Sequence, residues 1–143
     1  MSAVPPGYEL VVDPRRIDVA AAHAYLARSY WSPGIPYDVV ARAIANSLCV
    51  AVFCQGEQVG LARVVTDRAT FAYLADVYVL EEHRGRGLAK AMVRHLQDHP
   101  ELRGLRRWLL MTVDMQPLYA KLGWSPLAHP ERAMERHFPD IYA

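Results

Sequence analysis

Two arginines and two glycines alternate in the segment EEHRGRGLAK, residues 81–90, and give it the chemistry of an anion site. The segment lies between a β-rich run and a run with helical periodicity. The first turn of a helix carries backbone N–H groups without partners and a partial positive charge. Glycine lets a ligand approach the backbone closely, and Arg84 and Arg86 can add charge-assisted contacts. The pattern therefore indicates a cradle for phosphate oxygens.

The segment differs from the two best-known nucleotide-binding loops. A Walker loop needs Gly-Lys-Ser/Thr, which does not follow here, and the dinucleotide fingerprint needs a third glycine where Lys90 stands. The two glycines are equally compatible with a plain strand-to-helix turn on a solvated basic surface. The glycines alone leave both interpretations open.

The elements before this segment predict a helical pair followed by an antiparallel meander. A strand is expected at Tyr8–Val12, and a helix over residues 17–31 with Asp18 as its candidate N-cap. A second helix is expected from Pro36 to about Ser47. Three antiparallel strands should follow, over residues 48–54, 59–67 and 70–80.

The elements after the segment predict a parallel strand. Leu88, Ala91, Met92, His95 and Leu96 share one helix face, and the helix should end before Pro100. A strand is then expected over residues 106–113, parallel to residues 70–80 because a helix crosses between them. A short helix over residues 116–121, stopped at residue 123, and a last strand in the tail complete the expected order.

Length and composition favour one ordinary globular domain over residues 1–143. The chain has 143 residues, 52% of them hydrophobic, and a formal net charge of +1. This even balance does not suggest a nucleic-acid partner, and no run is long enough to cross a membrane. The N-terminus lacks the pattern of a signal peptide, so a cytoplasmic location is expected.

Two motifs resemble those of a known family, the GNAT superfamily of N-acetyltransferases. The segment VYVLEEHRGRGLAKAM resembles its core motif, Arg/Gln-x-x-Gly-x-Gly/Ala between a strand and a helix, here Arg84–Ala89. The segment LYAKLGW, Leu118–Trp124, resembles a second signature, a tyrosine in a short helix before Gly-aromatic. The element order fits over about residues 8–125, most similar to small bacterial members. The resemblance implies a GNAT-like α/β fold: a mixed sheet with antiparallel N-terminal strands and a parallel central pair, flanked by about four helices.

The resemblance implies acetyl-CoA as co-substrate and no metal. In this family the amides of the loop hold the pyrophosphate, and the preceding strand lies beside the pantetheine arm. Thr112 departs from the family pattern, which often has asparagine there, so its hydroxyl could bond the arm or the contact could be lost. The residues implied to bind the cofactor are Val77, Tyr78, Val79, Arg84, Gly85, Arg86, Gly87, Leu88, Ala89, Lys90 and Thr112.

The resemblance also implies two catalytic residues. Tyr119 matches the tyrosine near the thioester sulfur that acts as general acid, and its hydroxyl is protonated at neutral pH. The alternative is a tyrosine that only packs its ring. Asp76 could accept the amine proton directly or through water, or could be a structural carboxylate bonded to backbone or an arginine. Asp114 is a weak further candidate.

The implied acceptor side is the segment SYWSPGIPYD between the first two helices. Tyr30, Trp31 and Tyr37 could line a pocket for a primary amine of a small molecule, or could cap the core beneath the loop. Arg63 and Asp67 could meet a polar acceptor or form surface pairs.

Other functions stay open at this stage. A non-catalytic CoA-binding module could use the same fold, and a protein or peptide could be the acceptor. His95 and His99 have a spacing that can bind zinc, but the glutamate of the zinc motif is missing, so a metal is not expected. The tail could finish the sheet or support a homodimer.

Overall fold

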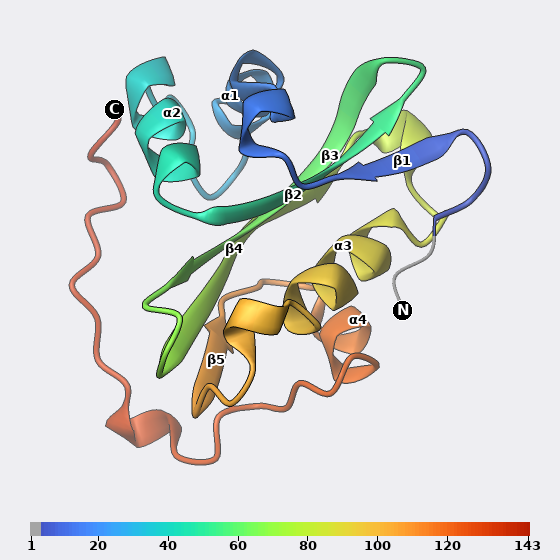
Figure 1. Ribbon diagram of the computed structural model, residues 1–143. Coiled ribbons are helices and arrows are strands. Elements are labelled where there is room, and N and C mark those ends of the chain that lie inside the picture. The colour runs from blue at the N-terminus through green and yellow to red at the C-terminus, as the bar shows by residue number, and fades with distance from the viewer. Residues whose placement is uncertain (1–3) are drawn as a thin grey trace.

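The computed structural model describes residues 4–143 and contains one five-stranded sheet (Figure 1). The strands follow the order β1-β2-β3-β4-β5, with each of the first four antiparallel to its neighbours in this series. Strand β5 runs parallel to β4, as the crossover helix predicts. The predicted mixed sheet is therefore confirmed. The strand bounds are β1 Tyr8–Val11, β2 Leu48–Cys54, β3 Glu57–Thr66, β4 Phe71–Val79 and β5 Arg107–Leu110.

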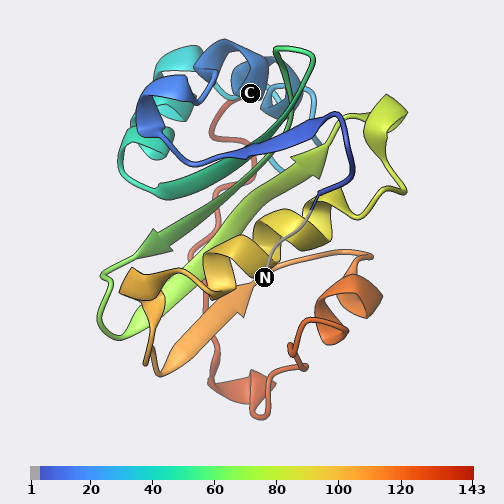
Figure 2. The same cartoon turned by 45° about the vertical axis from the view of Figure 1, so that its right-hand side comes forward.

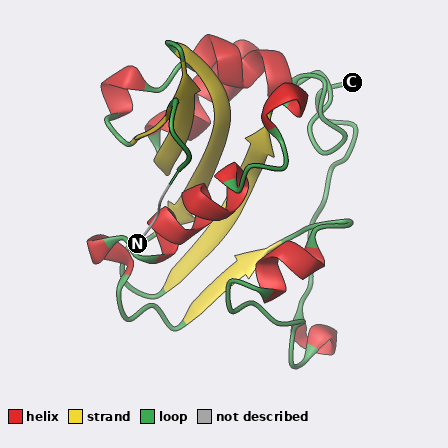
Figure 3. Ribbon diagram, turned by 90° about the vertical axis from the view of Figure 1, so that its right-hand side faces the viewer, coloured by secondary structure: helices red, strands yellow, loops and turns green. Residues whose placement is uncertain are grey.

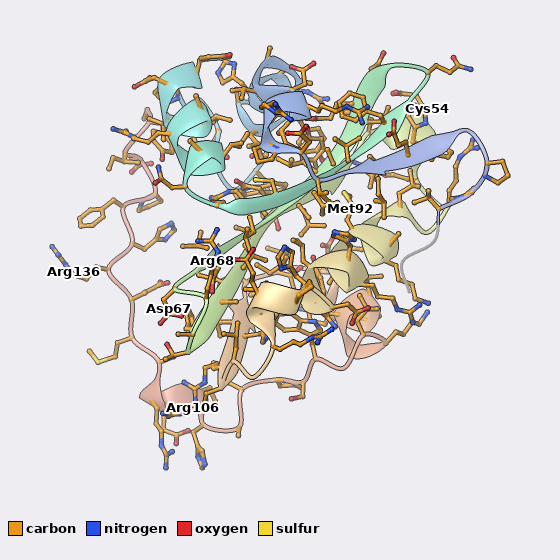
Figure 4. The ribbon with its side chains drawn as sticks, viewed as in Figure 1. Cys54, Asp67, Arg68, Met92, Arg106 and Arg136 are labelled. Carbon is orange, nitrogen blue, oxygen red and sulfur yellow. The ribbon has the colours of Figure 1, made fainter. Side chains whose placement is uncertain are left out.

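Helices cover both faces of the sheet and form two separate cores (Figures 1 and 2). On one face, α1 (Val19–Leu26) and α2 (Tyr37–Ala45) pack on β2, β3 and Tyr78. On the other face, α3 (Leu88–Gln97) and α4 (Gln116–Ala120) cover the sheet. Met92 of α3, labelled in Figure 4, is fully buried there. Apolar burial on both faces supplies the main stabilisation.

Side-chain hydrogen bonds determine both ends of α1. The Asp18 carboxylate accepts a bond from the Ala21 amide at 3.0 Å, which confirms the predicted N-cap. The helix ends at Leu26, five residues earlier than predicted. The Ser29 hydroxyl donates to the Leu26 carbonyl at 2.7 Å, and the Ser32 hydroxyl donates to the same oxygen at 3.2 Å. These bonds compete with further helical turns.

Two other predicted boundaries need correction. Pro36 is the N-cap of α2 and is extended, with φ −66° and ψ 151°, so the helix begins one residue later than predicted. Strand β5 ends at Leu110 rather than at residue 113 because its last pair with β4 is Leu74↔Leu110. Beyond this pair the two strands separate.

The predicted last strand is absent from residues 124–143. This tail has only one 3-10 turn, Pro130–Arg132, and its side chains are mostly exposed. Three prolines in the tail disfavour sheet pairing. The parallel pair therefore lies at one end of the sheet rather than at its centre. The tail runs along the outside of the molecule, where Arg136 points to solvent (Figure 4), and Tyr142 lies against Gly34.

The β3–β4 turn explains the role of Asp67. Its carboxylate accepts hydrogen bonds from the Ala69, Thr70 and Phe71 amides and from the Thr70 hydroxyl. These bonds, above all those from Thr70, hold the pKa of Asp67 well below its usual range. Asp67 and Arg68 lie at the turn that begins β4 (Figure 4), about 30 Å along that strand from its other end. Asp67 therefore organises a turn and does not approach the predicted acceptor side.

Candidate active site

The loop between β4 and α3 has the geometry of a cradle. Gly85 and Gly87 both have positive φ, at 79° and 76°, and Gly87 is the N-cap of α3. Residues with a Cβ rarely adopt this conformation, which explains the alternating glycines. Within residues 4–143, a Cβ added at either position would meet no other atom within 4 Å. The described part of the chain therefore leaves space beside the loop for a ligand.

The amides of this loop have no hydrogen-bond partners within residues 4–143. The six amides from Gly85 to Lys90 are all without one, and the first helical bond runs from the Ala91 amide to the Gly87 carbonyl at 3.0 Å. No side chain caps the helix at Gly87. A run of unpartnered N–H groups at a helix start is suited to bind several anionic oxygens at once.

The end of β4 is open on the side of β5. Pairing with β5 covers only Phe71–Leu74, whereas β4 continues to Val79, and the two strands separate toward their C-terminal ends (Figure 3). The Leu80 amide bonds the Val59 carbonyl of β3 at 2.8 Å. Because successive residues of a strand direct their backbone groups to opposite sides, the backbone of Val79 faces the opening.

A β-bulge in β4 lies at the point where the two strands part. Leu61 pairs with Tyr78 and Arg63 with Ala75, so Asp76 and Val77 together oppose one residue of β3. Asp76 has φ 54°, the left-handed region, which is unusual for a residue within a strand. No sequence signal indicated this bulge.

The Asp76 carboxylate is held by two side chains. Arg63 Nε donates to Oδ2 at 2.6 Å, and Trp31 Nε1 donates to Oδ1 at 2.8 Å. The Arg63 and Asp76 side chains are only 17% and 12% exposed, so the pair is not a surface pair. Both carboxylate oxygens therefore already accept a hydrogen bond from a side chain. The geometry favours the structural interpretation of Asp76 over the general base.

Tyr119 lies on α4 and is buried, with its ring edge-on to Trp124 at 6.0 Å between centroids. Burial, with a smaller contribution from the nearby Tyr30, raises the pKa of Tyr119 to about 12. The hydroxyl is thus protonated at neutral pH and has a proton to donate. Tyr30 belongs to the loop between α1 and α2, so the two predicted regions approach each other.

The aromatic residues of that loop divide into two groups. The Tyr30 and Trp31 rings lie edge-on at 5.0 Å, and Tyr25 of α1 lies 6.2 Å from Trp31. Tyr25 stacks on Tyr78 at 4.0 Å. Tyr37 is separate from this cluster, because its ring packs edge-on against His23.

Two further predicted residues lie in the turn before α4, and one of them, Thr112, organises it. The Thr112 hydroxyl accepts a bond from the Met115 amide at 3.1 Å, and the Thr112 carbonyl accepts one from Gln116. Asp114 lies in the same turn and is exposed. Thr112 can therefore still donate its hydroxyl proton, while its oxygen lone pair stabilises the turn.

The sequence interpretation missed Tyr25, which contacts both the acceptor loop and the arginine motif. Its ring lies between Trp31 and Tyr78, and its hydroxyl accepts a bond from Arg84 Nη2 at 3.1 Å. A tyrosine on a mostly apolar helix looks like ordinary core, so its residue type alone gave no signal.

Residues 4–143 contain no cluster of three or more metal-ligating side chains and no helix long and apolar enough to cross a membrane. A cavity of about 370 Å³ lies away from the cradle, at the C-terminal end of α3. Gln97, Trp108 and residues 122–125 line it, and none of them belongs to the predicted site.

Comparison with known proteins extends these observations. Residues 15–124 match the acetyltransferase (GNAT) family. A protein of Gibberella zeae assigned as an acetyltransferase is 33% identical, with 80% of this chain and 76% of that protein covered. A crystal structure of a Xanthomonas campestris pv. campestris protein, assigned to the same family, is 45% identical with a TM-score of 0.93 and covers 96% of this chain and 98% of that one.

A third protein shares the fold alone. The Clostridium acetobutylicum acetyltransferase structure, determined with acetyl-CoA, is 17% identical with a TM-score of 0.66 and covers 91% of this chain and 94% of that one. The family match over most of the chain, together with the two closer relatives, establishes the assignment. This chain belongs to the GNAT family of acetyltransferases.

Proposed function

We propose that this protein transfers the acetyl group of acetyl-CoA directly to a primary amine of a small molecule. The observation that carries this proposal is the run of unpartnered amides from Gly85 to Lys90 at the start of α3. A diphosphate is the part of coenzyme A that such a run would hold. The structure of similar fold from Clostridium acetobutylicum contains acetyl-CoA, which supports the same ligand here.

The chemistry of several residues around the cradle supports this ligand. Open space beside Gly85 and Gly87 leaves room for phosphate oxygens, and the exposed Arg86 can reach a phosphate at the rim. The backbone of Val77 and Val79 on the open end of β4 would pair with the amide groups of the pantetheine arm, and Tyr78 belongs to the same stretch. Leu88, Ala89 and Lys90 would contribute their amides, and Thr112 its hydroxyl.

The transfer needs an unprotonated amine and a protonated leaving group. The amine nitrogen attacks the thioester carbonyl, the new C–N bond forms, and the C–S bond breaks. Tyr119 would donate its proton to the departing thiolate, since its raised pKa keeps it protonated. The amine proton passes to water. Asp76 would act as the base only if its carboxylate left Arg63 and Trp31.

A protein or peptide acceptor is the second candidate. Its support is the exposure of Tyr30, which at 65% leaves the aromatic side of the site open to solvent. An open surface admits an extended chain, whereas a closed pocket would not. A non-catalytic CoA-binding module is less well supported, because it would not need a tyrosine donor near the site.

The deciding experiment measures free-thiol release from acetyl-CoA with a defined amine panel. The panel contains benzylamine, putrescine and a short lysine-containing peptide with a free N-terminus. Release that depends on an added small amine supports the proposal, and release with the peptide alone favours the second candidate. Tight coenzyme A binding without thiol release in any reaction would favour the binding module.

A further inference from the structure

The side chain at residue 76 is not explained by the bulge alone. The left-handed backbone at this position is easiest for glycine or asparagine, so an aspartate there needs another reason. The two other non-glycine residues with positive φ within residues 4–143, Gln55 and Arg68, lie in exposed turns. Asp76 instead lies within β4 with its carboxylate almost buried. Its contacts therefore suggest why aspartate is used.

The carboxylate joins three segments that are distant in the sequence. One oxygen accepts from Trp31 in the loop between α1 and α2, and the other accepts from Arg63 of β3. Arg63 Nη1 in turn donates to the Ser47 hydroxyl at 3.1 Å, just after α2. Because charge-assisted bonds are stronger than neutral ones, this carboxylate is well suited to hold the loop in one position.

Trp31 is the residue through which the loop would be held. Its indole is 39% exposed, so one part of the ring faces solvent while Nε1 is bonded inward. Tyr30 lies edge-on to the ring, and Tyr25 lies on another side. Losing the bond to Asp76 would release the ring at its only hydrogen-bonding atom.

We propose that Asp76 is a positioning residue that latches the acceptor loop to the β4 bulge through Trp31. The latch sets the orientation of the Trp31 and Tyr30 rings, and hence the affinity for the amine. The cradle amides belong to another loop, so the latch does not act on the part of the site that would hold the diphosphate. This inference rests on the proposed function for the meaning of the acceptor loop, but the latch itself is a structural claim.

The first test observes the latch without any substrate. Trp31 is one of three tryptophans, so its indole N–H signal can be assigned in a nitrogen–proton spectrum by comparison with Trp31→Phe. We expect hydrogen exchange at this N–H to be at least tenfold faster in Asp76→Gly, which keeps the left-handed backbone and removes the carboxylate. Unchanged exchange in a folded Asp76→Gly protein overturns the latch.

The second test measures acceptor kinetics with the panel amine that has the highest kcat/KM. Trp31→Phe deletes only the indole donor, and Asp76→Asn removes the charge that strengthens the bond. Each variant should raise the amine KM about tenfold, the effect of one hydrogen bond to a charged group. The amine KM of the double variant should be close to that of either single variant, because both substitutions remove the same interaction. The exposed Asp98→Asn is the matched control, with an unchanged KM.

The outcomes separate this role from general-base catalysis. A latch leaves the pH profile of kcat in place, whereas loss of a base removes the acidic limb and lowers kcat by 100-fold or more. A kcat at least 100-fold lower in Asp76→Asn, with loss of the acidic limb, overturns the inference. An unchanged amine KM in Trp31→Phe also overturns it. If wild-type protein acetylates no panel amine, the proposed function fails, and the exchange measurement alone decides the latch.

Discussion

The Nε atom of Arg84 donates a hydrogen bond of 2.9 Å to the carbonyl oxygen of Val79, five residues earlier in the chain. This carbonyl lies at the open end of β4, where no neighbouring strand pairs with it on that side. Arg84 Nη2 also bonds the Tyr25 hydroxyl, so the guanidinium is directed toward the strand end. Arg86 makes no such hydrogen bond to any residue of 4–143, and its guanidinium lies 6.0 Å from the Tyr8 ring. The two arginines of the motif therefore differ in role.

This difference predicts that alanine at residue 84 lowers stability, whereas alanine at residue 86 lowers the affinity for coenzyme A. Arg84→Ala should lower the free energy of unfolding by about 1 kcal/mol, because it removes the partner of the Val79 carbonyl. Arg86→Ala should leave stability unchanged and weaken coenzyme A binding several-fold, with a smaller dependence on salt. Urea unfolding and calorimetric titration of both variants measure these effects. If both variants lost the same affinity for coenzyme A and neither lost stability, the two arginines would have the same role and the prediction would be wrong.

The glycines of the cradle allow a controlled substitution. Gly87→Ala should weaken coenzyme A binding more than tenfold, because the methyl group occupies the ligand's space and strains the positive φ by about 1–2 kcal/mol. Gly104 has a similar φ of 78° and equally open surroundings, so Gly104→Ala carries the same strain outside the site. Calorimetry should show a loss of affinity for Gly87→Ala only. A similar loss in both variants would show that strain, not the site, is responsible.

Tyr119→Phe should lower kcat by 10- to 100-fold, typical of a lost general acid, and leave coenzyme A affinity within twofold. Single-turnover kinetics and titration separate the two quantities. Unaltered single-turnover rates would remove Tyr119 from the chemistry.

The raised pKa of Tyr119 also predicts a dependence of stability on pH. Its folded value of about 12 lies above the reference value near 10, so burial favours the protonated form. The contribution to stability is complete below pH 10 and is lost as pH rises through 12. Unfolding followed from pH 9 to 12 should therefore show a shallower decline in Tyr119→Phe than in wild type. Parallel curves would contradict the pKa shift.

Tyr78 has a buried hydroxyl without a partner among the described residues. Its ring stacks on Tyr25, but its buried oxygen has no hydrogen bond to the described residues. The nearby Gln58 amide is already bonded to both backbone groups of Asp18. Tyr78→Phe should therefore stabilise the fold by about 1 kcal/mol or leave it unchanged, measured by urea unfolding. A loss above 1 kcal/mol would reveal a hidden partner.

The exposed apolar side chains of the tail predict self-association. Leu127, Met134, Phe138 and Ile141 are 44–97% exposed, although side chains of this kind are normally buried. Light scattering of the purified protein should give the mass of a homodimer. Replacing Phe138 and Ile141 by aspartate should give a monomer. A wild-type monomer at high protein concentration would contradict this prediction.

Much of the fold could be predicted from local sequence patterns. Asp18 and Gly87 each correctly predicted the start of a helix, and the apolar run at residues 48–54 predicted a buried strand. The two glycines between a strand and a helix were equally compatible with a cradle and with a plain turn, and the resemblance to the family favoured the cradle. The early end of α1 depends on local serine hydroxyls, Ser29 and Ser32, whose bonds to the Leu26 carbonyl the apolar spacing does not reveal. The β4 bulge and the Asp76 contacts could not be predicted, because each depends on residues distant in the sequence. Arg63 and Trp31, for example, meet Asp76 across separations of 13 and 45 residues.

The central claim is that the amides at the start of α3 hold the diphosphate of coenzyme A. Titration of nitrogen-labelled protein, followed by amide resonances, tests it most directly, with coenzyme A and with pantetheine, which lacks the diphosphate. We expect coenzyme A to shift the amides of residues 85–90 strongly and pantetheine to leave them in place. Coenzyme A binding that leaves these six resonances unmoved, or no binding at all, would contradict the account.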